Sequence, residues 1–262
     1  MAYAKVKYAL EGAVAVITLN DPSTLNAAAV DMVLELADAT KRAAGEARAV
    51  VLTGEGRGFS SGAKLGGDRP PLGEDGKVDL GKALEEAYNP FMSQLRDLPI
   101  PLVTAVNGAA AGVGCSIALM GDMILAGESA YFLQAFRRIG LVPDGGATYQ
   151  LPRMIGRARA MEMMLLGEKL PAAKALEWGL INRVVADADL MPAALKLASE
   201  LADGPTKTLG MIRKLAWQSL DNSWEEQLTA ERWSQRDVGR YGDFAEGVAA
   251  FLQKRPAKFT GN

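Results

Sequence analysis

Residues 107–148 combine small side chains with a carboxylate on a glycine-rich turn, a pattern that suits acid–base chemistry beside the backbone. A run of glycine and alanine opens this stretch, the apolar residues Ile117–Met120 predict the first turns of a helix, and one carboxylate, Asp144, precedes Gly145-Gly146. Small residues let a ligand approach the backbone closely. Peptide N–H groups at a helix start are unpaired and attract negative charge. The stretch therefore predicts a backbone anion site that faces a single acid–base side chain.

The composition limits the available chemistry. The 262-residue chain contains no histidine, which removes Ser-His and Cys-His nucleophile pairs, histidine metal sites and histidine general bases. Any reaction must use carboxylates, lysine, tyrosine, hydroxyl groups or the backbone. The single cysteine, Cys115, excludes an internal disulfide and fits a reducing compartment, so we expect a cytoplasmic protein.

Charge and hydropathy argue against two classes of partner. A formal net charge of −2 does not suit nucleic acid, which favours a basic protein face. The uncharged stretch 98–121 is interrupted by prolines, Asn107 and glycines, which suits a buried strand and helix better than a membrane span. We therefore expect neither nucleic-acid nor membrane binding, and we find no secretory signal pattern at the N-terminus.

Strand and helix patterns alternate in the first half of the chain. The predicted elements are a hairpin around Glu11-Gly12, helices over 30–45 and 80–95, and strands over 49–52 and 102–106. Segment 66–78, rich in glycine and charge, predicts a mobile surface loop. This order indicates an α/β fold with repeated strand-strand-helix units.

Strand signals nearly vanish after Thr148. The predicted helices cover 157–166, 171–178, 190–202, 206–220, 224–238 and 244–254. Apolar stripes such as Phe244, Val248 and Phe251 are typical of helices that pack on a core or on a partner subunit. We therefore expect a main core followed by a helical oligomerisation region.

Several motifs occur in a fixed order along the chain. They are Phe59-Ser-Ser-Gly-Ala-Lys-Leu65, Ala105-Val-Asn-Gly-Ala-Ala-Ala-Gly-Val-Gly114, Gly140-Leu-Val-Pro-Asp-Gly-Gly146, Gly167-Glu-Lys-Leu170 and Trp178-Gly-Leu-Ile181, with an ending over 246–259. In this order they resemble the enoyl-CoA hydratase/isomerase (crotonase) superfamily over essentially the whole chain. The resemblance implies a ββα spiral that binds acyl-CoA over 1–200 and a helical trimerisation region over 201–262. It also implies an acyl-CoA thioester ligand, a homotrimer or dimer of trimers, and no metal or redox cofactor, since coenzyme A enters with the substrate.

The resemblance places an oxyanion hole at the N–H groups of Ala63 and Val113. Removing a proton next to a thioester carbonyl puts negative charge on the carbonyl oxygen, and two preorganised donors there can contribute several kcal/mol. Ala63 follows Ser61-Gly62, and Val113 follows Gly112. The alternative is that both glycine runs are simply tight turns.

The carboxylates distinguish the reactions within this superfamily. Where the hydratases carry two glutamates, this chain has Ser116 and Phe136. Asp144 instead matches the carboxylate of the branch that contains 1,2-epoxyphenylacetyl-CoA isomerase and Δ3,Δ2-enoyl-CoA isomerases. The resemblance therefore implies an isomerase in which Asp144 moves one proton along the acyl group. Phe132, Phe136 and Leu141 could exclude water and raise the Asp144 pKa by desolvation.

Three alternatives to the isomerase stay open. Asp144 could activate water in a hydratase, or the protein could bind acyl-CoA without activity, or it could be an oligomeric scaffold with a vestigial site. A purely structural role is also open for Asp144, as the cap of a helix that begins near Gly145.

The resemblance implies further contacts with the thioester and its coenzyme A. These are Leu25, Ala27, Ser61, Lys64, Leu65, Gly112 and Phe136, together with Lys258 and Phe259, which would reach the nucleotide in their own or a neighbouring subunit. For Lys258 the competing interpretation is a solvated tail.

Overall fold

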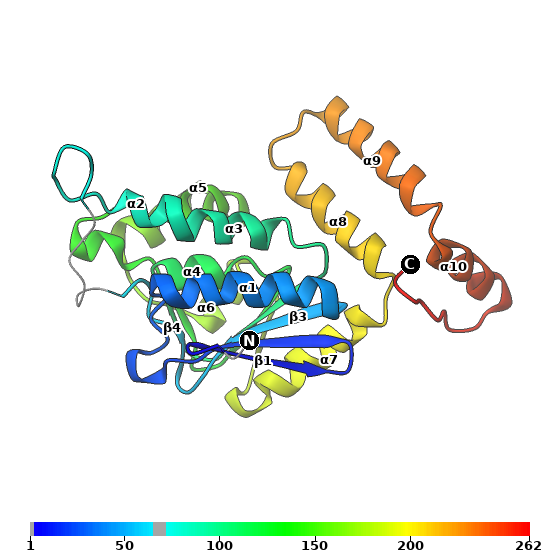
Figure 1. Cartoon of the computed structure of the whole chain (residues 1–262), viewed down its shortest axis with the longest axis horizontal. Helices are drawn as coiled ribbons and strands as arrows, with labels where there is room; N and C mark the ends of the chain where they lie inside the picture. The colour runs from blue at the N-terminus through cyan, green and yellow to red at the C-terminus, as the bar shows by residue number, and fades with distance from the viewer. Residues whose placement is uncertain (1–2, 65–71) are drawn as a thin grey trace.

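Two β-sheets form the centre of the fold in the computed structural model, which describes residues 3–64 and 72–262 (Figure 1). The six-stranded sheet has the order β1 (Val6–Glu11), β2 (Val14–Leu19), β3 (Ala49–Gly54), β5 (Leu102–Val106), β7 (Met123–Gly127) and β10 (Arg183–Val185). The four-stranded sheet has the order β4 (Gly58–Ser60), β6 (Ala109–Ala111), β8 (Tyr131–Leu133) and β9 (Leu170–Pro171).

A repeated unit builds both sheets at once. Strands β3, β5 and β7 are parallel neighbours in the larger sheet, and β4, β6 and β8, which follow them in the chain, are parallel neighbours in the smaller one. Each turn of the chain therefore adds one strand to each sheet and then crosses back through helical structure, as parallel pairing requires. The predicted α/β class and the ββα spiral are confirmed.

Helices cover both faces of the larger sheet. The α-helices of the described residues are α1 (Val30–Glu46), α2 (Gly81–Ala83), α3 (Asn89–Arg96), α4 (Val113–Ala118), α5 (Ala147–Leu166), α6 (Ala172–Glu177), α7 (Leu190–Ala202), α8 (Thr206–Gln218), α9 (Trp224–Val238) and α10 (Gly242–Gln253). Side chains of α1, α3 and α4 join the main apolar core, and α7 buries Leu190, Ala194 and Leu197 against the opposite face. Strands β3 and β5 are buried from both sides, which is why they are rich in valine, leucine and alanine.

Several predicted boundaries need correction. The helix expected over 80–95 is divided by a π-helical turn, Leu84–Tyr88, between α2 and α3. The helix expected at Ile117–Met120 begins earlier, at Val113, and α5 begins ten residues before its predicted start and is interrupted at Gly156. Strands β9 and β10, of two and three residues, were not predicted because they are too short for a periodic pattern.

The predicted loop over 66–78 lies partly outside the described residues. In its described part, Leu72 and Val78 form an isolated antiparallel bridge. In the part of the chain that the structure describes, no helix has the length and apolar character needed to cross a membrane.

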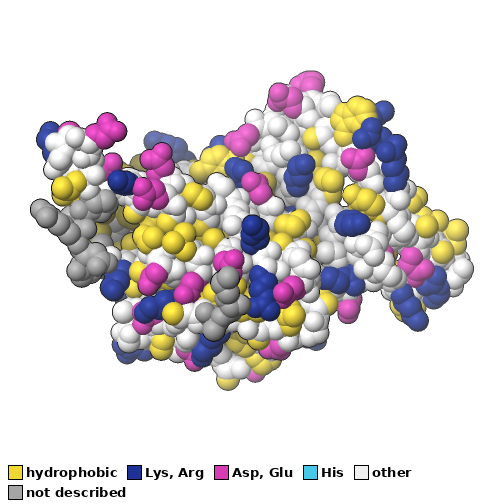
Figure 2. Space-filling view, viewed as in Figure 1, with side chains coloured by type: hydrophobic (Ala, Val, Ile, Leu, Met, Phe, Trp, Pro, Cys, Tyr) yellow, Lys and Arg dark blue, Asp and Glu magenta, His cyan; other side chains and the backbone are white. Residues whose placement is uncertain are grey.

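The C-terminal helices extend away from the sheets as an arm of α8, α9 and α10 (Figure 1). Large apolar side chains lie on the surface of this arm, among them Trp224, which is 72% exposed, and Phe251, which is 83% exposed. Figure 2 shows hydrophobic side chains at the surface in this region. The boundary at residue 200 and the trimer stay predictions.

A buried arginine anchors this arm to the core. Arg213 of α8 is 6% exposed, and its Nε donates to the Asp122 carboxylate at 2.6 Å. Its Nη atoms donate to the carbonyl oxygens of Arg96, Leu98 and Leu95 at 2.6–2.8 Å. A planar guanidinium can satisfy all these acceptors at once, so Arg213 fastens α8 to the end of α3 and to the turn before β5.

Replacing this arginine should destabilise the fold strongly. Arg213→Met leaves the Asp122 carboxylate with only the Leu102 N–H as donor and removes the guanidinium from three carbonyl groups. We expect the free energy of unfolding to fall by about 3 kcal/mol in urea titrations. The control Arg236→Met removes the exposed pair with Asp237 and should cost less than about 1 kcal/mol. Equal losses in the two variants would contradict the anchoring role.

Candidate active site

Two glycine loops touch where β4 and β6 end. Gly62 has a φ of +94° and Gly112 a φ of +53°, a region that other residues rarely adopt. A Cβ on Gly62 would lie 2.8 Å from the carbonyl oxygen of Ala111 and 3.5 Å from the Cα of Gly112. The loops approach backbone to backbone, and the N–H groups of Ala63 and Val113 follow directly on either side of the contact.

Both N–H groups lack a partner within the described residues. Val113 is the first residue of α4, so its N–H has no acceptor inside the helix. Neither this group nor the N–H of Ala63 donates to another described group of the chain. The N–H of Gly112, by contrast, donates to the carbonyl of Leu133 at 2.8 Å, which holds the second loop against β8. The arrangement presents two available donors from neighbouring loops.

The turn that carries Asp144 packs against the start of α4. The Ser116 hydroxyl donates to the main-chain carbonyl of Asp144 at 2.9 Å. A Cβ on the next residue, Gly145, would lie 3.1 Å from Cγ2 of Val113 and 2.9 Å from Cβ of Ser116. Glycine at 145 therefore lets this turn settle onto the helix whose first N–H is one of the two donors.

The Asp144 carboxyl group is half-buried and poorly solvated. Its Oδ1 is buried and has no hydrogen-bond partner among the described residues. Desolvation raises the pKa of Asp144 from 3.8 to about 6. The helix-cap alternative is wrong, because Gly146 occupies the N-cap position of α5 and no side chain caps that helix. An unpaired carboxyl group with this pKa can both accept and return a proton near neutral pH.

One of the three predicted shielding residues lies beside the glycine contact. A Cβ on Gly112 would lie 3.7 Å from the Phe136 ring, which is 7% exposed. Phe132 is fully buried in the main core, whereas Leu141 is 40% exposed. Phe136 thus provides the apolar contact at the second loop, and Leu141 does not form a buried shield in this structure.

Residues 25–28 run alongside the loop of Ala63. The N–H of Ser61 donates to the carbonyl of Leu25 at 2.9 Å, and Ala27 lies two residues further along this segment. Lys64 is exposed directly after Ala63, and Leu65 lies outside the described residues. The structure therefore places Leu25, Ala27, Ser61 and Lys64 around one loop.

The two C-terminal candidates lie elsewhere in this chain. The N–H of Lys258 donates to the Glu246 carboxylate at 2.7 Å, and the Phe259 ring lies 3.5 Å from where a Cβ on Gly247 would be. Both residues follow α10, and the Phe259 carbonyl accepts from Arg48 at 3.3 Å, beside the start of β3, whereas β4 follows the end of β3. Within one chain they do not reach the Ala63 loop.

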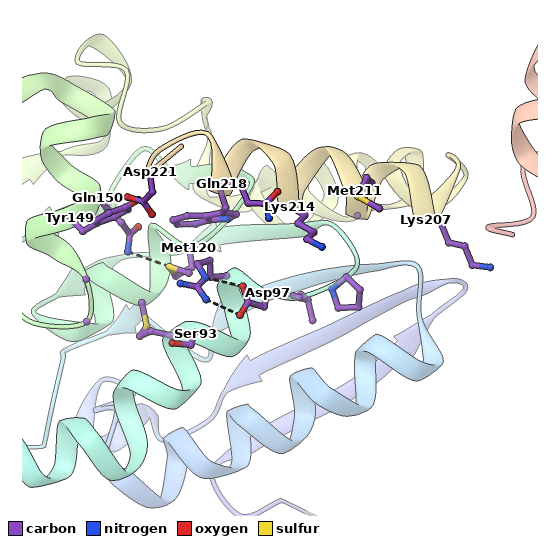
Figure 3. Close-up of a pocket in the computed structure, with 18 of the residues that line it drawn as sticks. Ser93, Asp97, Met120, Tyr149, Gln150, Lys207, Met211, Lys214, Gln218 and Asp221 are labelled. Carbon is purple, nitrogen blue, oxygen red and sulfur yellow. Dashed lines mark hydrogen bonds and ion pairs between the residues drawn. The ribbon is translucent and has the colours of Figure 1, made fainter. Parts of the chain in front are cut away.

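A cavity of about 870 Å³ borders the turn of Asp144 from another side (Figure 3). Its walls come from α3, α5 and α8 and include Gly145, Gly146 and Met120, but not Asp144 or Val113. Figure 3 shows Tyr149 and Asp221 on one wall, where the Tyr149 hydroxyl donates to Asp221 at 2.9 Å. We did not predict this cavity, because its residues are far apart in sequence.

The fold and this site define a known class of protein. The family model described as enoyl-CoA hydratase/isomerase matches residues 9–262. The chain belongs to the enoyl-CoA hydratase/isomerase family. It is an enzyme of this family, and an acyl-CoA thioester fits the family as substrate.

Individual relatives carry both names of the family. The chain is 44% identical over 261 residues to a "Probable enoyl-CoA hydratase" of Rhodobacter capsulatus, covering 100% of both chains. It is also 44% identical over 254 residues to the 1,2-epoxyphenylacetyl-CoA isomerase of Escherichia coli, covering 96% of this chain and 97% of that one. A crystal structure of enoyl-CoA hydratase from Bacillus anthracis has a TM-score of 0.91 at 27% identity, covering 98% of this chain and 100% of that chain.

Because the pKa of Asp144 is raised, ionisation of its carboxyl group should lower the free energy of unfolding. The carboxyl group ionises near pH 3.8 when unfolded and near pH 6 when folded, so stability falls as pH rises between these values. Relative to Asp144→Asn, the wild type should therefore lose about 1–2 kcal/mol of unfolding free energy between pH 4 and pH 7. This is less than the roughly 1.4 kcal/mol per pKa unit of a fully buried group, because water screens this partly exposed carboxyl group. Urea titrations of both proteins at each pH measure this difference.

An aspartate with the opposite shift provides the control. The backbone N–H of Ser129 holds the pKa of Asp187 below its usual value, so Asp187→Asn should lose stability relative to the wild type as pH rises. If the two variants follow the same pH dependence, the Asp144 carboxylate is not desolvated as described.

Proposed function

We propose that the protein is an acyl-CoA isomerase that shifts a double bond, or opens a ring epoxide, by a proton shuttle through Asp144. The observation that carries this proposal is the unpaired, desolvated Asp144 carboxyl group on a turn packed against the start of α4, whose first N–H is one of the two available donors.

The reaction divides between the backbone and one side chain. The N–H groups of Ala63 and Val113 bind the thioester oxygen, and the Asp144 carboxylate removes a proton from the acyl chain. The negative charge moves onto the thioester oxygen as the dienolate forms, where two preorganised donors stabilise it. The same carboxyl group then returns the proton two carbons along, so the double bond shifts and no other acid is needed.

The residues at the other two carboxylate positions support the isomerase. Ser116 and Phe136 cannot act as a second acid–base pair, since the Ser116 hydroxyl already donates to the Asp144 carbonyl and Phe136 has no ionisable group. Addition of water by the two-carboxylate route needs one group to activate water and another to protonate carbon. A single carboxylate suffices for proton transfer within one substrate.

Hydratase activity is the second candidate. The relative from Rhodobacter capsulatus named for it is as similar to this chain as the isomerase relative is. In this alternative Asp144 activates a water molecule at the same oxyanion site.

The proposal also assigns the remaining contacts. Leu25, Ala27, Ser61, Lys64 and Leu65 line the groove for coenzyme A, with Gly112 and Phe136 at the thioester. Lys258 and Phe259 contact the nucleotide from a neighbouring subunit of a homotrimer or dimer of trimers, because they are remote from the Ala63 loop of their own chain. We propose no metal or redox cofactor.

Deuterium uptake separates these functions. With a 3-enoyl-CoA in deuterium oxide, the wild type should incorporate label into the product, and Asp144→Asn should lower the rate at least about 100-fold while acyl-CoA affinity changes less than about 3-fold. Asp187→Asn, at an exposed site, should behave as the wild type. Full activity in Asp144→Asn would place the base elsewhere.

The substrate decides between the two candidate reactions. A panel of 2-enoyl, 3-enoyl and ring-epoxide thioesters should show turnover of the 3-enoyl or epoxide substrates. Hydration of the 2-enoyl substrate alone would favour the hydratase. Binding without turnover or label would indicate a carrier.

A further inference from the structure

The segment beside the Ala63 loop is held in a strained conformation. Leu25 and Asn26 have φ values of 57° and 56°, the left-handed region that costs energy for residues other than glycine. The buried Asn26 side chain stabilises it: its Nδ2 donates to the carbonyls of Glu55 and Gly58 at 2.9 and 2.8 Å, and its Oδ1 accepts from the N–H of Asp21 at 2.9 Å. We call residues 25–28 the brace.

The brace sets the direction of the Ala63 N–H. The N–H of Ala28 donates to the carbonyl of Gly62 at 2.8 Å. In a planar trans peptide the carbonyl and the following N–H point in opposite directions, and the chain contains no described cis peptide. A hydrogen bond that fixes the Gly62 carbonyl therefore also fixes the Ala63 N–H on the other side of the same peptide.

Two buried hydroxyl groups fasten the brace. The Tyr88 hydroxyl donates to the carbonyl of Ala28 at 2.6 Å, and Tyr88 is 6% exposed. The Ser60 hydroxyl, fully buried, donates to the carbonyl of Asn26 at 2.8 Å and accepts from the N–H of Gly62 at 3.3 Å. The peptides on both sides of Gly62 are thus held, one directly by Ser60 and the other through Ala28 by Tyr88.

Tyr88 also lies within electrostatic reach of Asp144. It ends the π-helical turn Leu84–Tyr88, a rare geometry that often marks functional sites. Burial and, secondly, the Asp144 charge raise the pKa of Tyr88 to about 12, so its hydroxyl stays protonated. Because the Tyr88 hydroxyl donates its hydrogen bond to the Ala28 carbonyl, it does not donate one to the Asp144 carboxylate.

We propose that Tyr88 and Ser60 are positioning residues: they fasten the brace so that the N–H of Ala63 points at the thioester oxygen. This inference rests on the proposed oxyanion hole. Neither side chain touches the substrate in this role; each acts through the main chain of Asn26, Ala28 and Gly62.

The test is the carbonyl stretching frequency of a bound thioester in Tyr88→Phe and Ser60→Ala. The probe is butanoyl-CoA labelled with ¹³C at the thioester carbonyl, because hydrogen bonds to this oxygen lower its stretching frequency in difference infrared spectra. The wild type should lower the frequency relative to free butanoyl-CoA. Each variant should lose a large part of that shift. With a 3-enoyl-CoA as substrate, turnover should fall about 10-fold or more while KM changes less than about 3-fold.

Matched controls remove hydroxyl groups that do not contact the brace. Thr53→Val deletes a buried hydroxyl that donates to Ala105 at 2.8 Å, and Tyr8→Phe deletes a tyrosine hydroxyl that donates to Glu46 at 3.0 Å. Both should keep the wild-type carbonyl shift and turnover. Melting curves of all variants verify folding, and Ser60→Ala decides the test if Tyr88→Phe does not fold.

The outcomes separate this inference from the proposed function. A wild-type protein that binds butanoyl-CoA without any carbonyl shift has no oxyanion hole, and the proposed mechanism fails. A wild-type shift that both folded variants retain leaves the mechanism standing and overturns the positioning role.

Discussion

The close contact between two main-chain loops is the constraint on which the rest of the structure depends. Gly62 and the Ala111–Gly112 peptide approach so closely that a single added methyl group would collide. The spiral makes this contact possible, because each turn places its second strand beside that of the preceding turn and ends both at the same edge. Two N–H groups from residues 50 positions apart, Ala63 and Val113, therefore follow directly after the two sides of one backbone contact. Donors of this kind need no reorganisation when charge develops on a bound oxygen.

The polar side chains around this edge are paired with main-chain groups, whereas the Asp144 carboxyl group is not. Buried polar groups in proteins are nearly always paired, and the Asn26, Ser60 and Tyr88 side chains follow this rule. The Oδ1 of Asp144 is one of the few exceptions among the described residues, and its burial raises the pKa of the carboxyl group by desolvation. The desolvated Asp144 carboxylate thus lowers the stability of the folded protein. Groups with shifted pKa values of this kind are concentrated at functional sites.

Local residue types predicted the glycine run before α4, Asp144 and the alternation of strands and helices. The spiral and the pairing of Ala63 with Val113 were predicted from the family resemblance. Tyr88, Ser60 and Asn26 were missed, since hydrogen bonds between a side chain and a distant carbonyl leave no periodic signal. The Arg213 anchor escaped prediction for the same reason: its acceptors lie more than 90 residues away. Lys258 and Phe259 were predicted from resemblance alone, and one chain does not bring them to the Ala63 loop.

The proton donors near Asp144 favour a shift of a double bond over the addition of water. The hydroxyl protons of Ser116 and Tyr88 are donated to main-chain carbonyls, and burial raises the pKa of Cys115 to about 12, so this thiol holds its proton. Phe136 occupies the other position where a hydratase has an acid. Water addition by the two-carboxylate route would require a second nearby group to exchange a proton with carbon. A shift of a double bond needs one group that takes a proton from carbon and then donates a proton to another carbon, which the Asp144 carboxyl group can do with a pKa of about 6.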